Sequence, residues 1–275
     1  MDIQRFINMC NLGSVNSAQA ILNANPNIDI SAYEEEAFRH ACLGKANNVV
    51  YWLLEIKDDI NITACDNQGF RWACETGNLD LVIFLYNYKP GMDICILNNY
   101  AFRFASFGGH YKILKWLYEK NPDGVLPAVN EDLFQIACYN GFLKIIQLFL
   151  EINPNLDISK NNEKAFRNAC KNGKTKILKW LFIIKPDIDM SVIDNLTFWN
   201  VCNEGYDETV LWLYTVSKEK KRLFNIAPRK YKIKLAIIHL AVRKIKKAWM
   251  DCYYSPYTKI GIKRLNRECD ILGIY

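Results

Sequence analysis

The chain has 275 residues, of which 51% are hydrophobic and 13% aromatic, and it carries a formal net charge of +6 at pH 7. This apolar content excludes wholesale disorder, and no apolar run approaches the ~20 residues that a membrane span needs. The N-terminal segment Met1–Asn8 is charged and unlike a signal peptide, so we expect an intracellular, cytoplasmic protein.

Phenylalanine recurs along the chain with constant spacing. It occupies positions 6, 38, 70, 102, 134, 166 and 198, always 32 residues apart. A fixed period of this size is typical of stacked structural units, whereas a single globular core would not impose it. The sequence therefore predicts an all-α repeat solenoid with seven units.

Other columns keep the same register and predict a first helix in each unit. A small apolar residue and usually a cysteine follow the Phe at offsets +3 and +4, and glycine follows at +7. These offsets share one helix face, so the Phe and the Ala-Cys pair are expected to be buried. The glycine is expected to end the helix in the left-handed conformation that glycine adopts most freely. We expect the Asp or Asn four residues before the Phe to cap the helix: Asp66, Asn98, Asn130, Asn162 and Asp194.

A second helix and a loop complete each unit. Two large apolar residues at offsets +14 and +15, such as Trp116-Leu117, mark this helix, and proline at +20 stops it. An apolar-Asp-apolar stretch follows, as in Leu156-Asp157-Ile158. The second unit is the least regular, with Lys45 in the glycine position and Asp58 in the proline position. Each unit is therefore helix, turn, helix and loop, and only stacking buries its apolar faces.

This pattern resembles the ankyrin repeat, a unit of about 33 residues with two antiparallel helices. The matching features are Ala-Cys pairs such as Ala73-Cys74 in the family's Ala-Ala position, the helix-ending Gly and the apolar pair of the second helix. The family's Thr-Pro-Leu-His opening is replaced by Ala-Phe-Arg, as in Ala101-Phe102-Arg103, without the family's His. The recurring Ala-Phe-Arg, Ala-Cys, Asn-Gly and Lys-Trp-Leu motifs are similar to those of divergent ankyrin repeats of giant DNA viruses, and this resemblance implies a viral protein. Tetratricopeptide stacking, with a period of about 34 residues, is the structural alternative.

Two recurring polar positions lie outside the apolar columns. The arginine after the Phe either forms a ladder with loop carboxylates or faces solvent (Arg39, Arg71, Arg103 and Arg167). The recurring loop aspartates are expected to be solvated or to stabilise their loops (Asp29, Asp93, Asp157 and Asp189).

Six of the ten cysteines fall in one repeat column: Cys10, Cys42, Cys74, Cys138, Cys170 and Cys202. Equivalent positions of stacked helices lie ~8–10 Å apart, which is too far for a disulfide. Zinc binding is not expected either, because the chain has no Cys-x-x-Cys pair and three histidines. We expect buried, reduced thiols.

The chain shows no catalytic constellation: it lacks a phosphate loop, a nucleophile elbow and a helix with paired histidines. We therefore expect a protein without enzyme activity, cofactor, metal or small-molecule substrate. Because repeat scaffolds present surfaces, the expected function is protein binding.

One candidate site lies on the first helices at offsets +2 and +5. The central repeats carry large apolar residues there, namely Trp72, Phe104, Phe107, Ile136 and Tyr139. The terminal repeats carry polar residues at these offsets: Asn8, Asn11, Asn168, Lys171, Asn200 and Asn203. This distribution predicts a partner-binding surface with a central anchor cluster. The alternative is that Trp72, Phe104 and Ile136 are core, with Phe107 and Tyr139 the better candidates for exposure.

The other candidate is the tail, since the charge is strongly segregated. Residues 1–214 hold 19 basic and 25 acidic side chains, a net of −6, whereas residues 215–275 hold 16 and 4, a net of +12. After Pro228 an amphipathic helix is expected, with the apolar stripe Leu235, Ile238, Val242, Ile245, Trp249 and Cys252. Basic residues surround this stripe, among them Arg243, Lys244, Lys246 and Lys247.

Several functions of this tail are open. It either caps the last repeat or recruits a second partner. Its basic amphipathic pattern fits calmodulin or a membrane surface, and its charge also allows nucleic acid. Poxvirus ankyrin proteins often end in an F-box-like segment, so the resemblance implies a ubiquitin-ligase subunit as another partner. The basic run Lys218–Arg222 is either a solvated linker or a nuclear address.

The sequence thus predicts an ankyrin-type helix-turn-helix solenoid over residues 1–214 and a basic helical extension over residues 215–275. The expected function is a non-enzymatic protein-interaction scaffold, such as a viral adaptor that binds a host protein. A tail-mediated nucleic-acid or membrane-surface protein, or a structural virion component, is the alternative.

Overall fold

A computed structural model describes residues 2–188, 190–217, 220–237 and 240. It divides into two units, residues 1–168 and 169–275, with the boundary inside one helix. We number the repeats 1 to 7 by their column phenylalanine.

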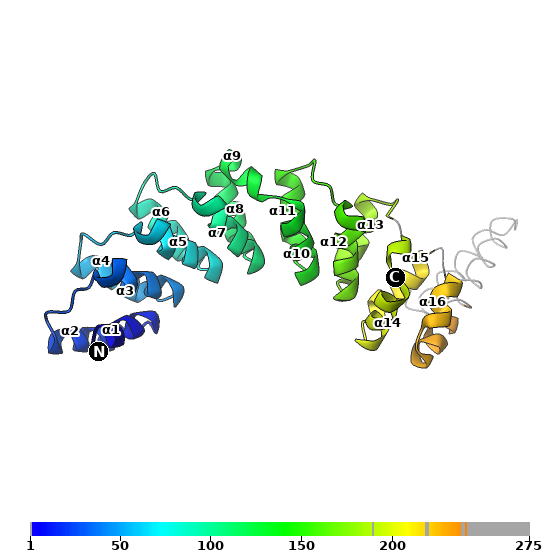
Figure 1. Cartoon of the computed structure of the whole chain (residues 1–275), viewed down its shortest axis with the longest axis horizontal. Helices are drawn as coiled ribbons and strands as arrows, with labels where there is room; N and C mark the ends of the chain where they lie inside the picture. Colours follow the sequence, from blue (N-terminus) through cyan, green and yellow to red (C-terminus); the bar gives the residue numbers. More distant parts are fainter. Residues whose placement is uncertain (1, 189, 218–219, 238–239, 241–275) are drawn as a thin grey trace, which may run out of the picture. The chain divides into compact units, whose positions relative to one another are not determined.

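Each repeat contributes a helix pair, as predicted (Figure 1). The first helices are α1 (Asp2–Asn11), α3 (Ala32–Leu43), α5 (Ala64–Thr76), α7 (Ile96–Phe107), α10 (Glu131–Asn140), α12 (Lys160–Lys171) and α14 (Asn195–Asn203). The second helices are α2 (Val15–Ala24), α4 (Asn47–Ile56), α6 (Leu79–Tyr88), α8 (Tyr111–Lys120), α11 (Leu143–Ile152), α13 (Thr175–Ile184) and α15 (Asp207–Val216). Short helices α9 (Pro122–Val125), η1 (Leu126–Ala128) and η2 (Met190–Val192) lie in loops, and α16 (Lys220–Ile226) follows the last repeat.

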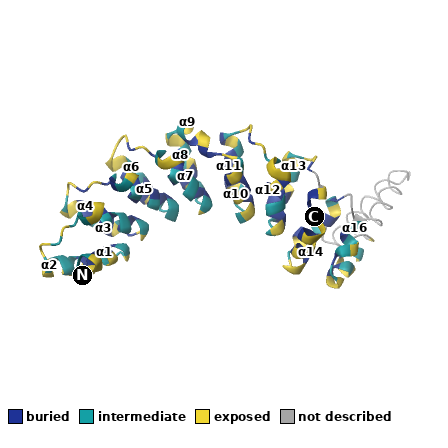
Figure 2. Cartoon of the chain, viewed as in Figure 1, coloured by how far each residue is buried: buried dark blue, intermediate teal, exposed yellow. Residues whose placement is uncertain are grey.

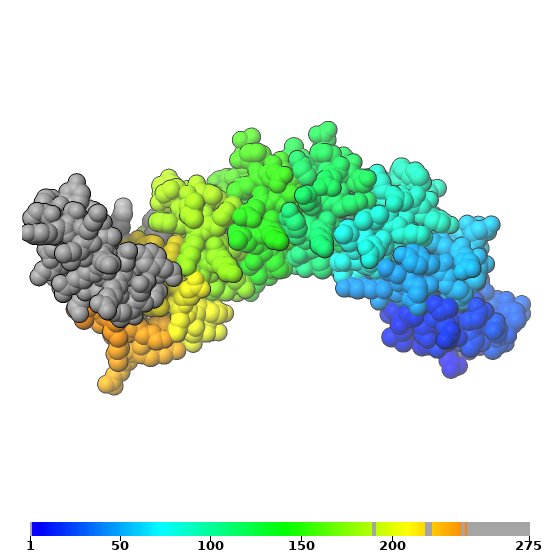
Figure 3. Space-filling view, turned by 180° about the vertical axis from the view of Figure 1, so that it is seen from behind, coloured from blue at the N-terminus to red at the C-terminus, as the bar shows by residue number. Residues whose placement is uncertain are grey.

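In residues 1–168 the first helices form a row in which α1 packs on α3, α3 on α5, α5 on α7 and α7 on α10. Each of these helices also packs on the second helix of its own repeat. The repeats of this unit follow one another in chain order, from blue to green in Figure 3. The described part of the chain contains helices and no strand.

The Phe, Ala and Cys columns form the core. Figure 2 colours the helices by burial, with buried residues dark blue. All seven column phenylalanines are at most 1% exposed, which confirms the predicted buried face. The six column cysteines are buried and free, as predicted. Burial raises the pKa of their thiols, to about 12 for Cys10 and Cys202. These thiols are therefore protonated at neutral pH and pack as small apolar side chains.

The column glycine ends the first helix in the left-handed region, as predicted. Gly77 has φ +82, and a Cβ there would lie 2.4 Å from the His110 ring, so both the conformation and the space require glycine. Lys45 occupies the same position in repeat 2 and adopts φ 58. This lysine therefore takes a backbone conformation that is unfavourable for any residue with a Cβ.

The predicted capping is correct in two repeats and wrong in three. Asn130 and Asp194 accept hydrogen bonds through Oδ1 from the backbone N–H groups of Leu133 (3.0 Å) and Thr197 (2.6 Å). Asp66, Asn98 and Asn162 instead have φ of 55 to 58. Each of these three is the middle residue of a left-handed turn rather than a cap.

The left-handed turn comprises three consecutive residues with φ between 50 and 62 at the start of the first helix. It occurs in repeats 2, 3, 4 and 6, at residues 33–35, 65–67, 97–99 and 161–163. Left-handed backbone costs a residue with a Cβ about 1–2 kcal/mol, so three in a row require local compensation.

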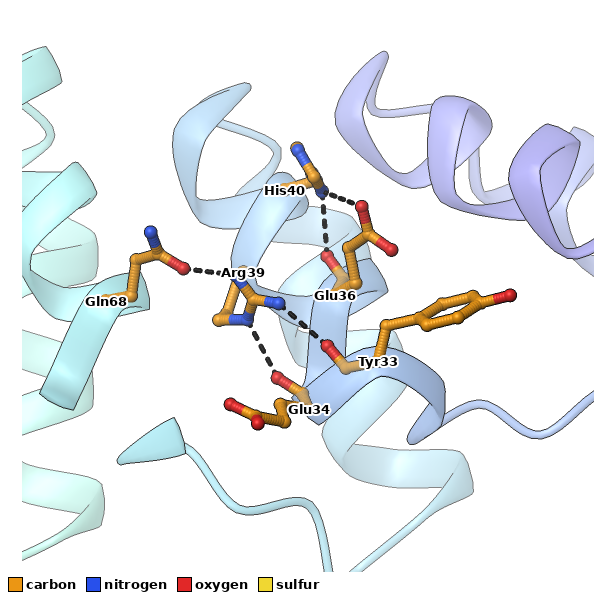
Figure 4. Close-up of polar contacts among 6 residues, drawn as sticks. All are labelled: Tyr33, Glu34, Glu36, Arg39, His40 and Gln68. Carbon is orange, nitrogen blue, oxygen red and sulfur yellow. Dashed lines mark hydrogen bonds and ion pairs between the residues drawn. The ribbon is translucent and has the colours of Figure 1, made fainter. Parts of the chain in front are cut away.

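In repeats 2 and 3 the arginine after the column Phe supplies that compensation. Arg71 donates from Nε to the carbonyl of Asp66 (2.8 Å) and from a terminal nitrogen to the carbonyl of Cys65 (2.9 Å). Arg39 donates in the same way to the carbonyls of Glu34 and Tyr33, both at 2.8 Å (Figure 4). We call this pair of bonds the carbonyl clamp. It excludes the solvent-facing alternative for Arg71, which is buried, and both arginines bond backbone carbonyls rather than loop carboxylates. Arg167 donates one such bond, to the Asn161 carbonyl at 3.1 Å, and the structure shows none for the half-buried Arg103.

Two further contacts fix the loops. Asp29, Asp93 and Asp157 each accept a hydrogen bond through Oδ1 from the backbone N–H two residues later, at 2.9 to 3.0 Å, so the aspartates stabilise their loops. The last residue of a left-handed turn bonds the loop that closes its repeat, since Asn67 Nδ2 donates to the Asp93 carbonyl at 2.9 Å. Asn99 Nδ2 makes the equivalent bond to the Gly124 carbonyl, also at 2.9 Å. Asp189 lies outside the described residues.

In residues 169–275, α14 packs on α15 and α16 packs on both. Residues 229–237 are helical and direct Tyr231 and Leu235 into this unit, where they are 1% and 0% exposed. Tyr231 donates its hydroxyl proton to Asp207 Oδ1 at the start of α15 (2.5 Å). Of the predicted tail stripe, only Leu235 is described.

No helix in the described ranges combines the length and apolarity needed to cross a membrane.

Candidate protein-binding surface

The five predicted anchor residues lie on three neighbouring first helices of residues 1–168. Trp72 is on α5, Phe104 and Phe107 are on α7, and Ile136 and Tyr139 are on α10. We call these five residues the central apolar surface. Since α5 packs on α7 and α7 packs on α10, the structure places them on consecutive elements.

Exposure differs among the five residues. Tyr139 is 52% exposed and Ile136 is 36% exposed, whereas Trp72, Phe104 and Phe107 are half-buried. Phe107 is less exposed than expected because its ring meets the Phe104 ring edge-on, with centroids 5.4 Å apart. None of the five is fully buried, so none is a core residue of the kind formed by the column phenylalanines.

Tyr100, which was not among the predicted site residues, supports this surface from within. Its ring stacks on Phe104 with centroids 3.9 Å apart and planes 10° apart. Tyr100 lies four residues before Phe104, so the two share one helix face, a spacing that could have revealed it. The stack and the edge-on contact of Phe107 fix the orientations of three rings on α7.

Tyr100 also joins α7 to α5. Its hydroxyl donates to Glu75 Oε2 (3.0 Å), and the Arg71 guanidinium lies 4.6 Å from its ring centroid. Burial first, and then the hydrogen bond to Glu75, raise the pKa of Tyr100, so the ring stays protonated at neutral pH. The arginine of the carbonyl clamp in repeat 3 is therefore also part of the support for the surface.

Trp72 is held from the other side by α3. Its ring lies 5.5 Å from the His40 ring, and His40 Nδ1 is 3.1 Å from the Glu36 carbonyl oxygen (Figure 4). Polar residues occupy the equivalent positions of repeat 1, where Asn8 is exposed and Asn11 half-buried. In residues 1–168 the apolar character of offsets +2 and +5 thus increases from repeat 1 toward the middle of the row.

The remaining predicted site residues are Arg243, Lys244, Lys246, Lys247 and Trp249, and they lie outside the described residues. Within the described ranges, no group of three or more His, Cys, Asp or Glu side chains could hold a metal ion.

The family model described as ankyrin repeats (3 copies) matches residues 101–194, and another described as ankyrin repeats (many copies) matches residues 70–118. Together with the helix pairs, these matches establish the fold as an all-α ankyrin-repeat solenoid. No curated protein matches the sequence significantly.

Proposed function

We propose that this chain is a non-enzymatic scaffold that binds one protein partner through the central apolar surface. Ankyrin repeats generally mediate protein–protein interaction. The observation that carries the proposal is the exposure of Tyr139 and Ile136 beside the braced rings of Phe104 and Phe107. Large apolar side chains held at a surface are typical anchors of protein interfaces.

The bracing of this surface favours tight binding. Tyr100, Glu75 and Arg71 hold the ring stack before any partner arrives, so little side-chain freedom remains to be lost on association. As a finer proposal, the scaffold is a viral adaptor that holds a host protein on its repeats. The tail then recruits a second protein, such as a ubiquitin-ligase subunit or calmodulin.

The test uses two matched double variants. Ile136→Ala with Tyr139→Ala truncates the exposed part of the surface. Ile56→Ala with Tyr51→Ala truncates the same residue types on α4, where each is 41% exposed, outside the surface. Proteins captured by the wild-type chain are identified by mass spectrometry, purified and titrated directly against all three proteins.

We expect the Ile136/Tyr139 variant to weaken a direct interaction by at least about tenfold, since each anchor contributes more than 1 kcal/mol at a hot spot. The Ile56/Tyr51 variant should bind like wild type, and both variants should remain folded at the temperature of the titration. Equal binding by all three proteins would refute this location of the site.

A further inference from the structure

A second surface lies on the helical residues 229–237 and 240. Three large aliphatic side chains there are exposed: Ile233 by 64%, Ile237 by 56% and Leu240 by 57%. They are spaced by four and three residues, which is the spacing of one helix face. We call these three residues the aliphatic ridge.

The ridge is not the face that packs the helix onto its own unit. Tyr231 and Leu235 are buried, and at 100° per residue they lie roughly opposite Ile233 and Ile237. Tyr231 also bonds Asp207, so the helix is fixed by one face while it presents the other. Tyr231 and Leu235 pack this helix onto its unit, and the aliphatic ridge takes no part in that packing.

Positive charge borders the ridge on both sides. Residues 220–240 include seven basic and no acidic side chains. Arg229 and Lys230 are exposed and flank the ridge on the helical wheel, whereas Lys234 is paired with Asp207. Long cationic side chains beside an apolar strip can reach headgroups while the strip enters the acyl boundary.

We propose that the aliphatic ridge binds an anionic lipid surface. Aliphatic side chains bordered by lysine and arginine match the layered chemistry of such a surface, which is apolar below and negatively charged at the headgroups. A nucleic acid would pair with the cations but leave three aliphatic side chains against phosphates. The charge of +12 over residues 215–275 adds long-range attraction to the same target.

The full-length chain is sedimented with vesicles of phosphatidylcholine and with vesicles of an equimolar mixture of phosphatidylcholine and phosphatidylserine. We expect the chain to bind the mixed vesicles alone. In the Ile233→Asp/Ile237→Asp variant the affinity for these vesicles should fall by at least about tenfold, because two aliphatic side chains can no longer insert into the lipid. The matched control is Ile183→Asp with Ile184→Asp on α13, where the isoleucines are 73% and 41% exposed, so that both variants add two negative charges. This control should retain binding.

Four results would overturn the proposal. The first is absence of vesicle binding, and the second is equal binding to both vesicle types. The third is a lower unfolding midpoint in the Ile233→Asp/Ile237→Asp variant than in the control, which would mean that other parts of the chain cover the ridge. The fourth is unchanged vesicle binding by this variant together with lost binding to calcium-loaded calmodulin, which would assign the ridge to a protein groove.

Discussion

Repeats 3 and 5 begin their first helices in different ways, although both place a phenylalanine in the same core column. Repeat 3 begins with the left-handed turn 65–67, held by the carbonyl clamp of Arg71. Repeat 5 begins with Asn130 in extended conformation, at φ −125 and ψ 173, and its side chain caps Leu133. Gln135 stands where repeat 3 has Arg71.

The difference follows the residue after the column Phe. That residue is arginine in repeats 2, 3, 4 and 6, which contain the left-handed turn, and Gln135 or Trp199 in repeats 5 and 7, which contain a side-chain cap. A guanidinium carries five N–H donors in a rigid fork, whereas the shorter glutamine side chain has a single NH2 group and tryptophan a single N–H. The full clamp forms in repeats 2 and 3, and Arg167 of repeat 6 makes one of its two bonds. We therefore infer that an arginine at this position favours the left-handed start over the capped one.

Arg71→Ala should have the largest effect, because it removes the carbonyl clamp that distinguishes repeat 3 from repeat 5. We expect the free energy of unfolding to fall by about 2–4 kcal/mol, because two carbonyls lose charged donors while the turn keeps its unfavourable backbone. Urea unfolding followed by circular dichroism measures the loss. Arg71→Lys should recover less than half of it, since an ammonium lacks the fork geometry.

The matching change in repeat 5 should have no such cost. Gln135 is 3% exposed, and its Oε1 is buried without a hydrogen-bond partner. Gln135→Leu should therefore leave the free energy of unfolding unchanged or raise it. A large loss for Gln135→Leu, or full stability for Arg71→Lys, would remove the distinction between the two starts.

The cap of repeat 5 is expected to have a smaller effect. Asn130→Ala removes the acceptor for the Leu133 N–H and should lower the free energy of unfolding by about 1 kcal/mol. Asn130→Asp keeps an acceptor in place and should remain within a few tenths of wild type. If the aspartate variant lost as much as the alanine variant, the cap would not be the stabilising contact.

The helix ends give a prediction of opposite sign. Lys45→Gly should raise the free energy of unfolding by about 0.5–1 kcal/mol, because glycine adopts φ 58 without the Cβ penalty that lysine bears. Lys45 is exposed, so little packing is lost. A lower unfolding midpoint for Lys45→Gly would show that the lysine side chain makes a stabilising contact.

The smallest effect concerns pH. The pKa of Glu131 at the start of repeat 5 is lowered, first by its own backbone N–H and then by Lys160 Nζ at 3.1 Å. Because the folded-state pKa lies below the unfolded value, the carboxylate stabilises the protein at neutral pH. This contribution is lost as the pH falls through the lowered pKa.

Thermal unfolding of wild type and Glu131→Gln across the acid range tests this effect. The midpoint difference should be present at neutral pH and vanish in acid. A difference that stayed constant with pH would assign the effect of the substitution to packing.

The periodic columns could be predicted from sequence because each is fixed by one strong local requirement. Phe38 and Cys42 follow a helix face, and Gly77 follows from a backbone angle. The left-handed turns could not be predicted from Asp66 or Asn98, because Asp and Asn favour caps and left-handed conformations alike. The distinguishing signal was the arginine five residues later, and for Arg71 its target is a pair of carbonyls that come together only once the turn has formed.

The sequence predicted which residues form the central apolar surface, but not how far each side chain is buried. Offsets +2 and +5 located Tyr139 and Ile136 on exposed parts of α10. The half-burial of Phe107 depends on its edge-on contact with Phe104, whose orientation depends in turn on Tyr100. Such a series of side-chain contacts depends on packing across several helical turns, and the repeat columns carry no information about it.

The bonds from the left-handed turns to the closing loops of their repeats have an evolutionary consequence. Asn67 and Asn99 each bind a backbone carbonyl in the next loop, so neither depends on the identity of the residue it meets. A recombination event that removes or duplicates 32 residues in register would join a turn to an equivalent carbonyl. The gene could thus lengthen or shorten its product by whole repeats, and new surfaces could arise without redesign of the joints.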